Sequence, residues 1–395
     1  MTGRTRDTYK TGHGRSATGF MQHKHGGDIY SYKTIKDFSA NINFRGMPEA
    51  VRTAASAAIA SSVHYPDPEY RKLREALAER ENQLLKRQKG MQCGTVLPQH
   101  LICGNGAAEL MFALASAVSP RRALLAVPSF FEYEQALASV GCEIDRFRLH
   151  EEDQFGVRDD FLNEIGKETD IIILGNPNNP TGRLLEKEFL EKLRQVCGRR
   201  GILLVLDESF SDFLCARDQM RTCHGAEWAI QEKNVFVIRS FTKMYAMPGL
   251  RFGYGICSDT VLLERMHLRL QPWNVSVPAQ AAAEAAAREL HFAEETALQT
   301  RCNRTEMQRQ MEEAGYRVIS SDANFLLFLG PRHLQEFCVR HGFLIRDCSN
   351  FPGLECEDGC WYRICVRSSE ENRELLEVLR EAAGSQAVRN NWKSR

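Results

Sequence analysis

Long hydrophobic runs are missing from this sequence. Of its 395 residues 43% are hydrophobic, yet no apolar stretch approaches the roughly 20 residues that a membrane-spanning helix needs. The hydrophobic residues are distributed along the chain and are numerous enough for a large core. Because a single core stops growing at about 250–300 residues, we expect a soluble protein with a main domain and a smaller second one.

An excess of charge of either sign is also missing. The chain carries 51 basic and 51 acidic residues, so its formal net charge at pH 7 is zero. The overall field therefore gives no reason to expect nucleic acid or an anionic membrane as a partner. If the substrate is anionic, individual arginines must bind it locally.

Closely paired cysteines are a third absence. The thirteen cysteines are an odd number, and several stand singly within apolar segments, as Cys103 and Cys257 do. Such cysteines typically fill a core as reduced thiols, which favours a cytoplasmic protein over a disulfide framework. Even the densest stretch, residues 348–365, contains no C-x-x-C pair, so the usual ligand spacings disfavour a zinc site there.

What the sequence does contain is an alternation of apolar runs and helical patterns. Short, continuously apolar runs bounded by Gly, Pro, Asn or Asp occur at residues 123–127, 171–174, 202–206, 235–238 and 252–256. Strands without polar alternation are buried on both faces, which is typical of a mostly parallel sheet covered by helices. We therefore predict an α/β domain, followed by a smaller α+β domain.

These patterns divide the chain into four predicted parts. Residues 1–24 are basic and rich in Gly, Ser and Thr, which predicts a flexible arm rather than a targeting segment. Residues 25–64 are predicted to pack on the small domain. The large domain is predicted to span residues 65–275, and the small C-terminal domain residues 276–395.

Four loops at the predicted carboxyl ends of strands are candidates for a binding site, because ligands of open α/β sheets bind at this edge. The first is Gly104-Asn105-Gly106, which precedes a predicted helix. The first N–H groups of that helix, at Ala107 and Ala108, can bind a phosphate. The spacing is not the G-x-G-x-x-G of dinucleotide-binding folds.

The second and third loops follow two buried strands. Residues 175–182, GNPNNPTG, combine two prolines with asparagines, which makes a stiff loop that fixes a side-chain amide. Asp207-Glu208 directly follows the run at 202–206, where a carboxylate is costly without a cationic partner. A protonated pyridine nitrogen would be such a partner, whereas the alternative reading is a helix N-cap.

The fourth loop contains Ser240-Phe241-Thr242-Lys243 and then Arg251 within Gly-Leu-Arg-Phe-Gly. Ser-x-x-Lys also occurs in penicillin-binding serine enzymes, but these need Ser-Asp-Asn and Lys-Thr-Gly downstream. Here Lys-Thr-Gly occurs only upstream, at residues 10–12, and Ser-Asp-Asn is missing. A lysine in such a loop can instead form a Schiff base with a carbonyl cofactor, and Arg251 can bind a phosphate bidentately.

The order of these motifs resembles that of the class I/II aminotransferases, which are pyridoxal 5′-phosphate (PLP) enzymes of fold type I. The motifs are, in chain order, Asn-Pro-x-Asn-Pro-x-Gly, Asp-Glu, and Ser-x-x-Lys with a following Gly-x-Arg-x-Gly. The resemblance runs from about His25 to the closing helix. It implies the PLP-dependent transferase fold, α/β with a mostly parallel seven-stranded sheet. It also implies PLP as the cofactor and a homodimer as the assembly.

The resemblance also implies roles for single residues. Lys243 would be the Schiff-base lysine, and Asp207 the partner of the pyridine nitrogen. Tyr133 would stack on the ring, and Asn179 would bind its phenolic oxygen. The cofactor phosphate would be held by a larger set: Gly106, Ala107, Ala108, Ser240, Arg251 and, from a second subunit, Tyr65.

Within the family, the chain is most similar to the L-threonine-O-3-phosphate decarboxylases of cobalamin biosynthesis, which are relatives of the histidinol-phosphate aminotransferases. The similarity lies at residues 25–27, 37–43, 345–353 and 362–368. Histidinol-phosphate aminotransferases usually have a tyrosine where this chain has Phe210, and phenylalanine matches the decarboxylases. Two departures are Phe44-Arg45, where Pro-Leu is usual, and Ala107-Ala108, which lacks a hydroxyl that often helps to bind phosphate.

A phosphorylated amino acid would bring two anionic groups to the site. Its phosphate carries about −1.5 to −2 at neutral pH, besides the carboxylate, which is more than one arginine can neutralise. By resemblance, Arg363 takes the carboxylate, and Arg346, His25 and Asn41 surround the phosphate, with Arg367 as a further candidate.

We therefore expect a PLP-dependent enzyme that decarboxylates L-threonine O-3-phosphate to (R)-1-aminopropan-2-yl phosphate. Three alternatives remain open from the sequence. The enzyme could prefer O-phospho-L-serine, it could transfer the amino group as histidinol-phosphate aminotransferases do, or the chain could be a non-catalytic PLP-fold binding protein.

Overall fold

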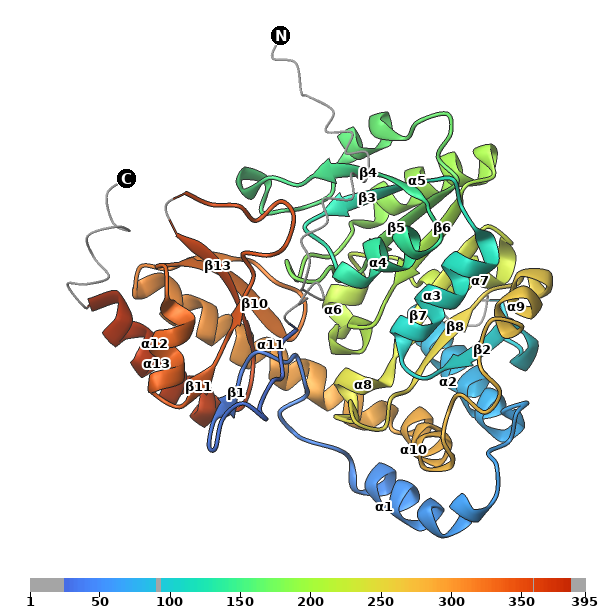
Figure 1. Ribbon diagram of the computed structural model, residues 1–395, viewed down its shortest axis with the longest axis horizontal. Helices are drawn as coiled ribbons and strands as arrows, with labels where there is room; N and C mark the ends of the chain where they lie inside the picture. The colour runs from blue at the N-terminus through green and yellow to red at the C-terminus, as the bar shows by residue number, and fades with distance from the viewer. Residues whose placement is uncertain (1–24, 90–93, 358, 385–395) are drawn as a thin grey trace, which may run out of the picture.

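The computed structural model describes residues 25–89, 94–357 and 359–384 (Figure 1). The predicted arm, residues 1–24, lies outside the described residues. Within the described ranges, no helix combines the length and the hydrophobicity needed to span a membrane.

A seven-stranded sheet with the order β2-β8-β7-β6-β5-β3-β4 forms the centre of the larger part of the molecule. The strands from β7 to β4 are parallel to their neighbours, and β8 is antiparallel to both β7 and β2. The sheet is therefore mostly parallel, as predicted. Its strands are β2 (Leu101–Gly104), β3 (Arg122–Val127), β4 (Glu143–Arg148), β5 (Ile171–Gly175), β6 (Leu203–Asp207), β7 (Val235–Ser240) and β8 (Gly253–Ile256).

Helices cover both faces of this sheet, and alternate strand residues face the two layers. On β7, Val237 belongs to one hydrophobic cluster and Phe236 to the other. The first cluster includes residues of α2 (Arg71–Lys89), α5 (Lys187–Arg200), α7 (Gly225–Gln231) and α10 (Val277–Arg288). The second includes residues of α3 (Ala107–Val118), α4 (Phe131–Ser139) and α9 (Thr260–His267). Burial on both faces explains why these strands are continuously apolar.

A second sheet lies beside the first, in the part drawn in orange and red in Figure 1. It has four antiparallel strands in the order β12-β13-β10-β9. A third hydrophobic cluster joins it to the helices that follow α10. The elements are β9 (Arg317–Ile319), β10 (Phe325–Gly330), β12 (Arg346–Asp347), β13 (Cys360–Cys365), α11 (Leu290–Glu313), α12 (Leu334–Arg340) and α13 (Ser369–Gly384).

The N-terminal segment contacts this second part through a short strand. β1 (Lys36–Asp37) pairs in parallel with β11 (Phe343–Leu344), and the fully buried Phe38 joins the third cluster. After it, α1 (Glu49–Ala58) packs on α10. The predicted boundaries at residues 64/65 and 275/276 stay predictions.

The remaining elements are short. They are the helices α6 (Ala216–Gln219) and α8 (Phe241–Met244) and the single 3₁₀ turns η1 (Ile59–Val63), η2 (Pro98–His100), η3 (Glu151–Asp153), η4 (Asp159–Glu164) and η5 (Ser211–Phe213). Of these, α8 matters most for function, because it directly follows β7 and contains Lys243.

Candidate active site

A pocket at the carboxyl ends of β5, β6 and β7 brings together most of the predicted site residues. Both sheets and the N-terminal segment contribute to its lining, so segments far apart in the sequence converge there. Of the residues predicted from the sequence, the pocket is lined by His25, Asn41, Ala107, Ala108, Tyr133, Asn179, Asp207, Ser240, Lys243, Arg251, Arg346 and Arg363.

One corner of the pocket is shaped to hold a phosphate. Gly106 has a φ of 85°, and a Cβ built on it would lie 2.6 Å from Nη2 of Arg251. A Cβ on Gly253 would lie 2.6 Å from the backbone nitrogen of Ala107. Only glycine therefore lets the Arg251 guanidinium and the first N–H groups of α3 approach so closely. Such a combination of a helix N-terminus and a guanidinium suits a phosphate dianion.

The hydroxyls of Ser240 and Thr242 line the same pocket, and their oxygen atoms lie 2.8 Å apart. Thr242 was not singled out from the sequence, although it stands within the Ser-x-x-Lys motif. Its hydroxyl adds a side-chain donor to a pocket in which Ala107 and Ala108 offer only backbone N–H groups.

Asp207 ends β6 and is 8% exposed. One carboxylate oxygen accepts hydrogen bonds from the backbone N–H and the hydroxyl of Ser209, and the other accepts one from the Tyr133 hydroxyl at 2.7 Å. Desolvation raises the pKa of Asp207, and the hydrogen bonds oppose this effect. Among the described residues, no Lys, Arg or His forms an ion pair with it, so the site fits a cationic pyridine nitrogen.

Tyr133 lies at the start of α4 and is 1% exposed. Burial and the nearby Asp207 carboxylate raise its pKa well above the ordinary value, so the hydroxyl stays protonated and donates to Asp207. This hydrogen bond was not foreseen from the sequence. The predicted stacking of Tyr133 on the cofactor ring stays a prediction.

The three asparagines of residues 175–182 have different structural roles. Asn176 bonds to Thr222 and to the backbone N–H of Leu185, and Asn178 bonds to the carbonyl of Pro128, so both hold the loop in place. Asn179 instead lines the pocket, where its amide oxygen accepts a hydrogen bond from Arg363.

Lys243 lines the pocket together with Arg363 and Arg251. Burial and, after it, the positive charges of Arg363 and Arg251 lower the pKa of its amine to about 8. A larger fraction of this amine is therefore neutral near physiological pH than for an exposed lysine. A neutral amine is the form that attacks a carbonyl carbon.

Arg346 and Arg363 face each other on β12 and β13 and are 7% and 6% exposed. Arg346 donates to the Asp347 carbonyl and to Asn350, and Arg363 donates to Asn179 and to the Ser39 carbonyl. Desolvation lowers the pKa of both guanidinium groups. In the part of the chain that the structure describes, neither forms an ion pair with a carboxylate.

His25, Asn41 and Glu132 complete the pocket. His25 is 58% exposed, and its Nε2 lies 3.6 Å from a carboxylate oxygen of Glu132. Burial lowers the pKa of His25, and so do the charges of Arg346, Lys243 and Arg363. Asn41 is buried, and its amide oxygen has no hydrogen-bond partner within the described part of the chain. Glu132 was missed from the sequence, although it directly precedes Tyr133.

Three predicted residues do not line the pocket. Gly106 is not in the lining, but it contacts the guanidinium of Arg251, which is. Tyr65 is 76% exposed and stacks on Trp273 at 4.1 Å between ring centroids, so its role in a second subunit stays a prediction. The guanidinium of Arg367 pairs with Glu371 at 2.7 Å, and the structure does not bring it to the pocket. Its role as a substrate ligand stays a prediction without geometric support.

The unusual Arg45 also points away from the pocket. Its guanidinium pairs with Glu295 at 3.1 Å and lies 4.6 Å from the ring centroid of Phe292, both on α11. Arg45 therefore contributes to packing on α11 and does not line the pocket.

Comparison with known proteins identifies the family. The family model described as aminotransferase class I and II matches residues 33–379. The chain belongs to this family. Class I and II aminotransferases use pyridoxal 5′-phosphate, which is therefore the cofactor of this chain, and the fold is that of the PLP-dependent transferases of type I.

Individual members of the family match over most of their length. A threonine-phosphate decarboxylase from Salmonella typhimurium is 35% identical, and the match covers 90% of this chain and 95% of that protein. A histidinol-phosphate aminotransferase from Geobacillus sp. is 30% identical, with 89% and 90% covered. The crystal structure of the histidinol-phosphate aminotransferase from Clostridium acetobutylicum is similar with a TM-score of 0.77 at 27% identity, covering 88% of this chain and 98% of that one.

Replacing Gly106 should weaken cofactor binding. In Gly106→Ala the added methyl group would collide with the Arg251 guanidinium, so the affinity for PLP, measured by equilibrium dialysis, should fall about tenfold or more. Gly141→Ala is the matched control, because Gly141 has a φ of 75° but open space around its Cβ position. Equal affinities of the two variants would contradict the assignment of this corner to the cofactor phosphate.

Replacing Lys243 should stabilise the cofactor-free protein. A pKa of about 8 against an ordinary 10.5 means that folding disfavours the protonated amine by about 3 kcal/mol below pH 8. Lys243→Met should therefore have the larger free energy of unfolding at pH 7, measured by denaturant titration. Between about pH 8 and 10.5 the unfolded chain holds the extra proton, so wild-type stability rises with pH and the difference should shrink.

The exposed Lys86 on the same protein provides the control for this measurement. Lys86→Met should change the free energy of unfolding by no more than about 0.5 kcal/mol. A Lys243→Met variant that is less stable than the wild type at pH 7 would show that the buried amine is not destabilising.

Proposed function

We propose that this chain catalyses the PLP-dependent decarboxylation of an O-phospho amino acid, L-threonine O-3-phosphate, to (R)-1-aminopropan-2-yl phosphate, a reaction of cobalamin biosynthesis. The observation that carries the proposal is the pair of buried guanidinium groups of Arg346 and Arg363, which have no carboxylate partner among the described residues. A buried charge without a partner is costly. Because Arg251 already serves the cofactor phosphate, two further anionic groups are expected, as in a phosphorylated amino acid.

The relatives support the same reaction. The Salmonella relative is named a threonine-phosphate decarboxylase, and its identity exceeds that of the histidinol-phosphate aminotransferase from Geobacillus. Phe210, which distinguishes this chain from the usual aminotransferase sequence, lines the pocket and packs edge-on against Phe325. It can give no hydrogen bond to the cofactor, which matches the decarboxylase pattern.

The cofactor-binding residues would act as follows. Bound PLP supplies an electron sink for the bond that breaks at the substrate Cα. The Nζ atom of Lys243 would hold the cofactor, and the Asp207 carboxylate would keep the pyridine nitrogen protonated. The α3 N–H groups, Ser240 and Arg251 would bind its phosphate. The Lys243 amine, once released from the cofactor, would be the group that returns a proton to the substrate Cα.

The substrate would be bound at both of its anionic ends. Arg363 would bind the α-carboxylate, and Arg346 would bind the phosphate together with His25 and Asn41, whose buried amide group faces the same pocket. Binding at two points restricts rotation about the bonds of Cα. This restriction would help to select which of those bonds breaks.

We also propose a homodimer. Exposed hydrophobic side chains gather at the end of α1 and in the loop after it, with Ile59 64%, Val63 82% and Tyr65 76% exposed. Burial of these side chains against a second copy would place Tyr65 at the neighbouring subunit, as the family resemblance implies. The molecular mass in solution, measured by sedimentation equilibrium, tests this assembly.

The decisive assay is to offer O-phospho-L-threonine to the PLP-loaded protein without a keto acid. We expect release of carbon dioxide and formation of aminopropanol phosphate, with slower turnover of O-phospho-L-serine. Turnover of histidinol phosphate that requires an added keto acid would instead show an aminotransferase and contradict the proposal.

Arg346→Met should remove the preference for a phosphorylated substrate. Because Arg346 is the buried cation assigned to the substrate phosphate, kcat/KM for O-phospho-L-threonine should fall about 100-fold or more, whereas any slow turnover of L-threonine should change little. The exposed Arg340→Met, on α12 of the same part of the molecule, is the control. An equal loss for both substrates in Arg346→Met would contradict the assignment.

A further inference from the structure

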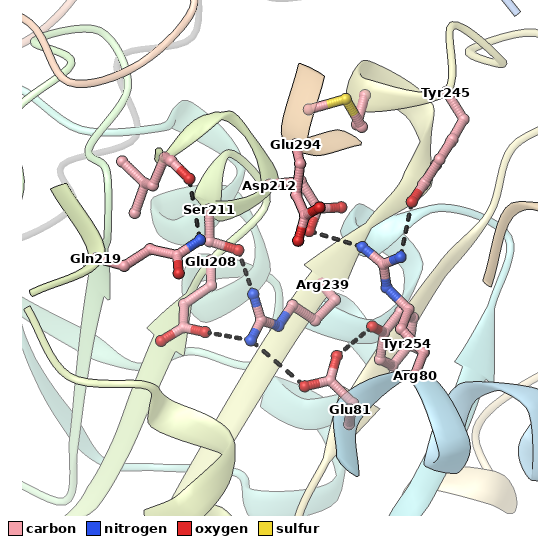
Figure 2. A network of polar contacts seen from close by, with 12 residues as sticks. Arg80, Glu81, Glu208, Ser211, Asp212, Gln219, Arg239, Tyr245, Tyr254 and Glu294 are labelled. Atoms are coloured by element: carbon pink, nitrogen blue, oxygen red, sulfur yellow. Dashed lines mark hydrogen bonds and ion pairs between the residues drawn. The ribbon is translucent and has the colours of Figure 1, made fainter. Parts of the chain in front are cut away.

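Helix α2 carries two adjacent ionic residues that are fully buried behind the site. Arg80 is 1% exposed and Glu81 is 0% exposed. In the sequence of α2 they stand among many charged residues and resemble a solvated face. In the structure they form the centre of a network of polar contacts (Figure 2).

Glu81 lies between the ends of β7 and β8. Its carboxylate accepts a hydrogen bond from the Tyr254 hydroxyl and lies 3.4 Å from Nη2 of Arg239. The same Arg239 nitrogen lies 3.0 Å from the carboxylate of Glu208, which also accepts a hydrogen bond from the backbone N–H of Gly225. Arg239 thus bridges two buried carboxylates.

Arg80 reaches the loop after β6 and helix α8. Its guanidinium pairs with Asp212 at 2.7 Å and donates to the Tyr245 hydroxyl at 2.7 Å. It also lies 5.1 Å from the centroid of the Phe241 ring. Phe241 and Tyr245 do not line the pocket, so Arg80 contacts the short helix that carries Lys243 through residues outside the pocket lining.

Four partners of this network are close in sequence to residues at the proposed cofactor site. Glu208 follows Asp207, Arg239 precedes Ser240, Tyr245 stands two residues after Lys243, and Tyr254 follows Gly253. Because successive strand residues face opposite sides of a sheet, the network holds these segments from behind while their neighbours face the pocket.

We propose that Arg80 and Glu81 are positioning residues of the cofactor site, which set the relative positions of Asp207, Ser240 and Lys243 through this network. The proposal rests on the cofactor site and not on the identity of the substrate. An apolar pair would fill the same space at a lower desolvation cost, but it would not fix directions as hydrogen-bonded ionic groups do. Groups that bind one rigid ring from three segments require such fixed positions.

Glu81→Gln and Arg80→Met test the proposal. Glu81→Gln keeps the size of the side chain and removes its charge. In folded protein, both variants should raise the dissociation constant for PLP about tenfold and shift the pH midpoint of the visible absorption band of the bound cofactor. Arg87→Met is the control, because Arg87 lies on the same helix in an exposed ion pair with Glu294, and it should change PLP affinity by no more than about twofold.

The unfolding temperature of the cofactor-free protein separates positioning from mere stabilisation. Lower unfolding temperatures with unchanged PLP affinity and an unchanged absorption band would overturn the proposal. If Arg80→Met does not fold, Glu81→Gln, Arg239→Lys and Arg239→Met test the proposal instead. Arg239→Lys should then bind PLP more tightly than Arg239→Met. None of these measurements uses a substrate, so a failed decarboxylation assay would leave their interpretation unchanged.

Discussion

The structure depends above all on how the buried carboxylate of Asp207 is accommodated. A carboxylate at the end of a central strand loses its hydration, and three hydrogen bonds from Ser209 and Tyr133 replace only part of it. Desolvation therefore still raises its pKa. A cationic partner would remove this penalty, and a protonated pyridine nitrogen is the partner that the family cofactor offers. In the proposed site the carboxylate would thus favour the protonated form of the cofactor before any substrate binds.

The same pocket has an excess of positive charge although the whole chain has none. Lys243, Arg251, Arg346 and Arg363 line it, and Asp207 and Glu132 are the acidic residues of its described lining. Burial lowers the pKa of Lys243 and of His25, and repulsion from the neighbouring cations adds to this effect. Each bound anion, whether cofactor phosphate, substrate carboxylate or substrate phosphate, would reduce this repulsion. Net charge alone could not reveal the excess, because it arises from where the chain places a few arginines.

The sequence predicted the strands and the loops better than the directions of side chains. A continuous apolar run followed by a proline-rich loop marks the end of β5, and an apolar run followed by two acidic residues marks the end of β6. Residues 175–182 and Asp207 could therefore be placed at the sheet edge. Arg363 and Arg367 could not be distinguished in this way. β13 ends at Cys365, so the alternation that turns Arg363 towards the pocket no longer applies to Arg367, which instead pairs with Glu371. The burial of Arg80 could not be predicted from the sequence either, because it depends on partners from distant segments of the chain.

Two adjacent acidic residues, Asp207 and Glu208, stand at the end of β6. Their different surroundings explain why an ionic network, and not apolar packing, lies behind the site. Asp207 faces Tyr133 and the pocket, whereas Glu208 pairs with Arg239 of β7 and accepts a hydrogen bond from the backbone N–H of Gly225 at the start of α7. Burial raises the pKa of Glu208 to about 7, and Arg239 opposes this shift. If β6 slipped by one residue against β7, the two carboxylates would exchange faces. Apolar packing alone would tolerate such a slip at a strand of similar aliphatic residues. A slip of β6 would break the ion pair between Glu208 and Arg239. The ion pair therefore disfavours the slip and keeps the shorter side chain of Asp207 in the pocket.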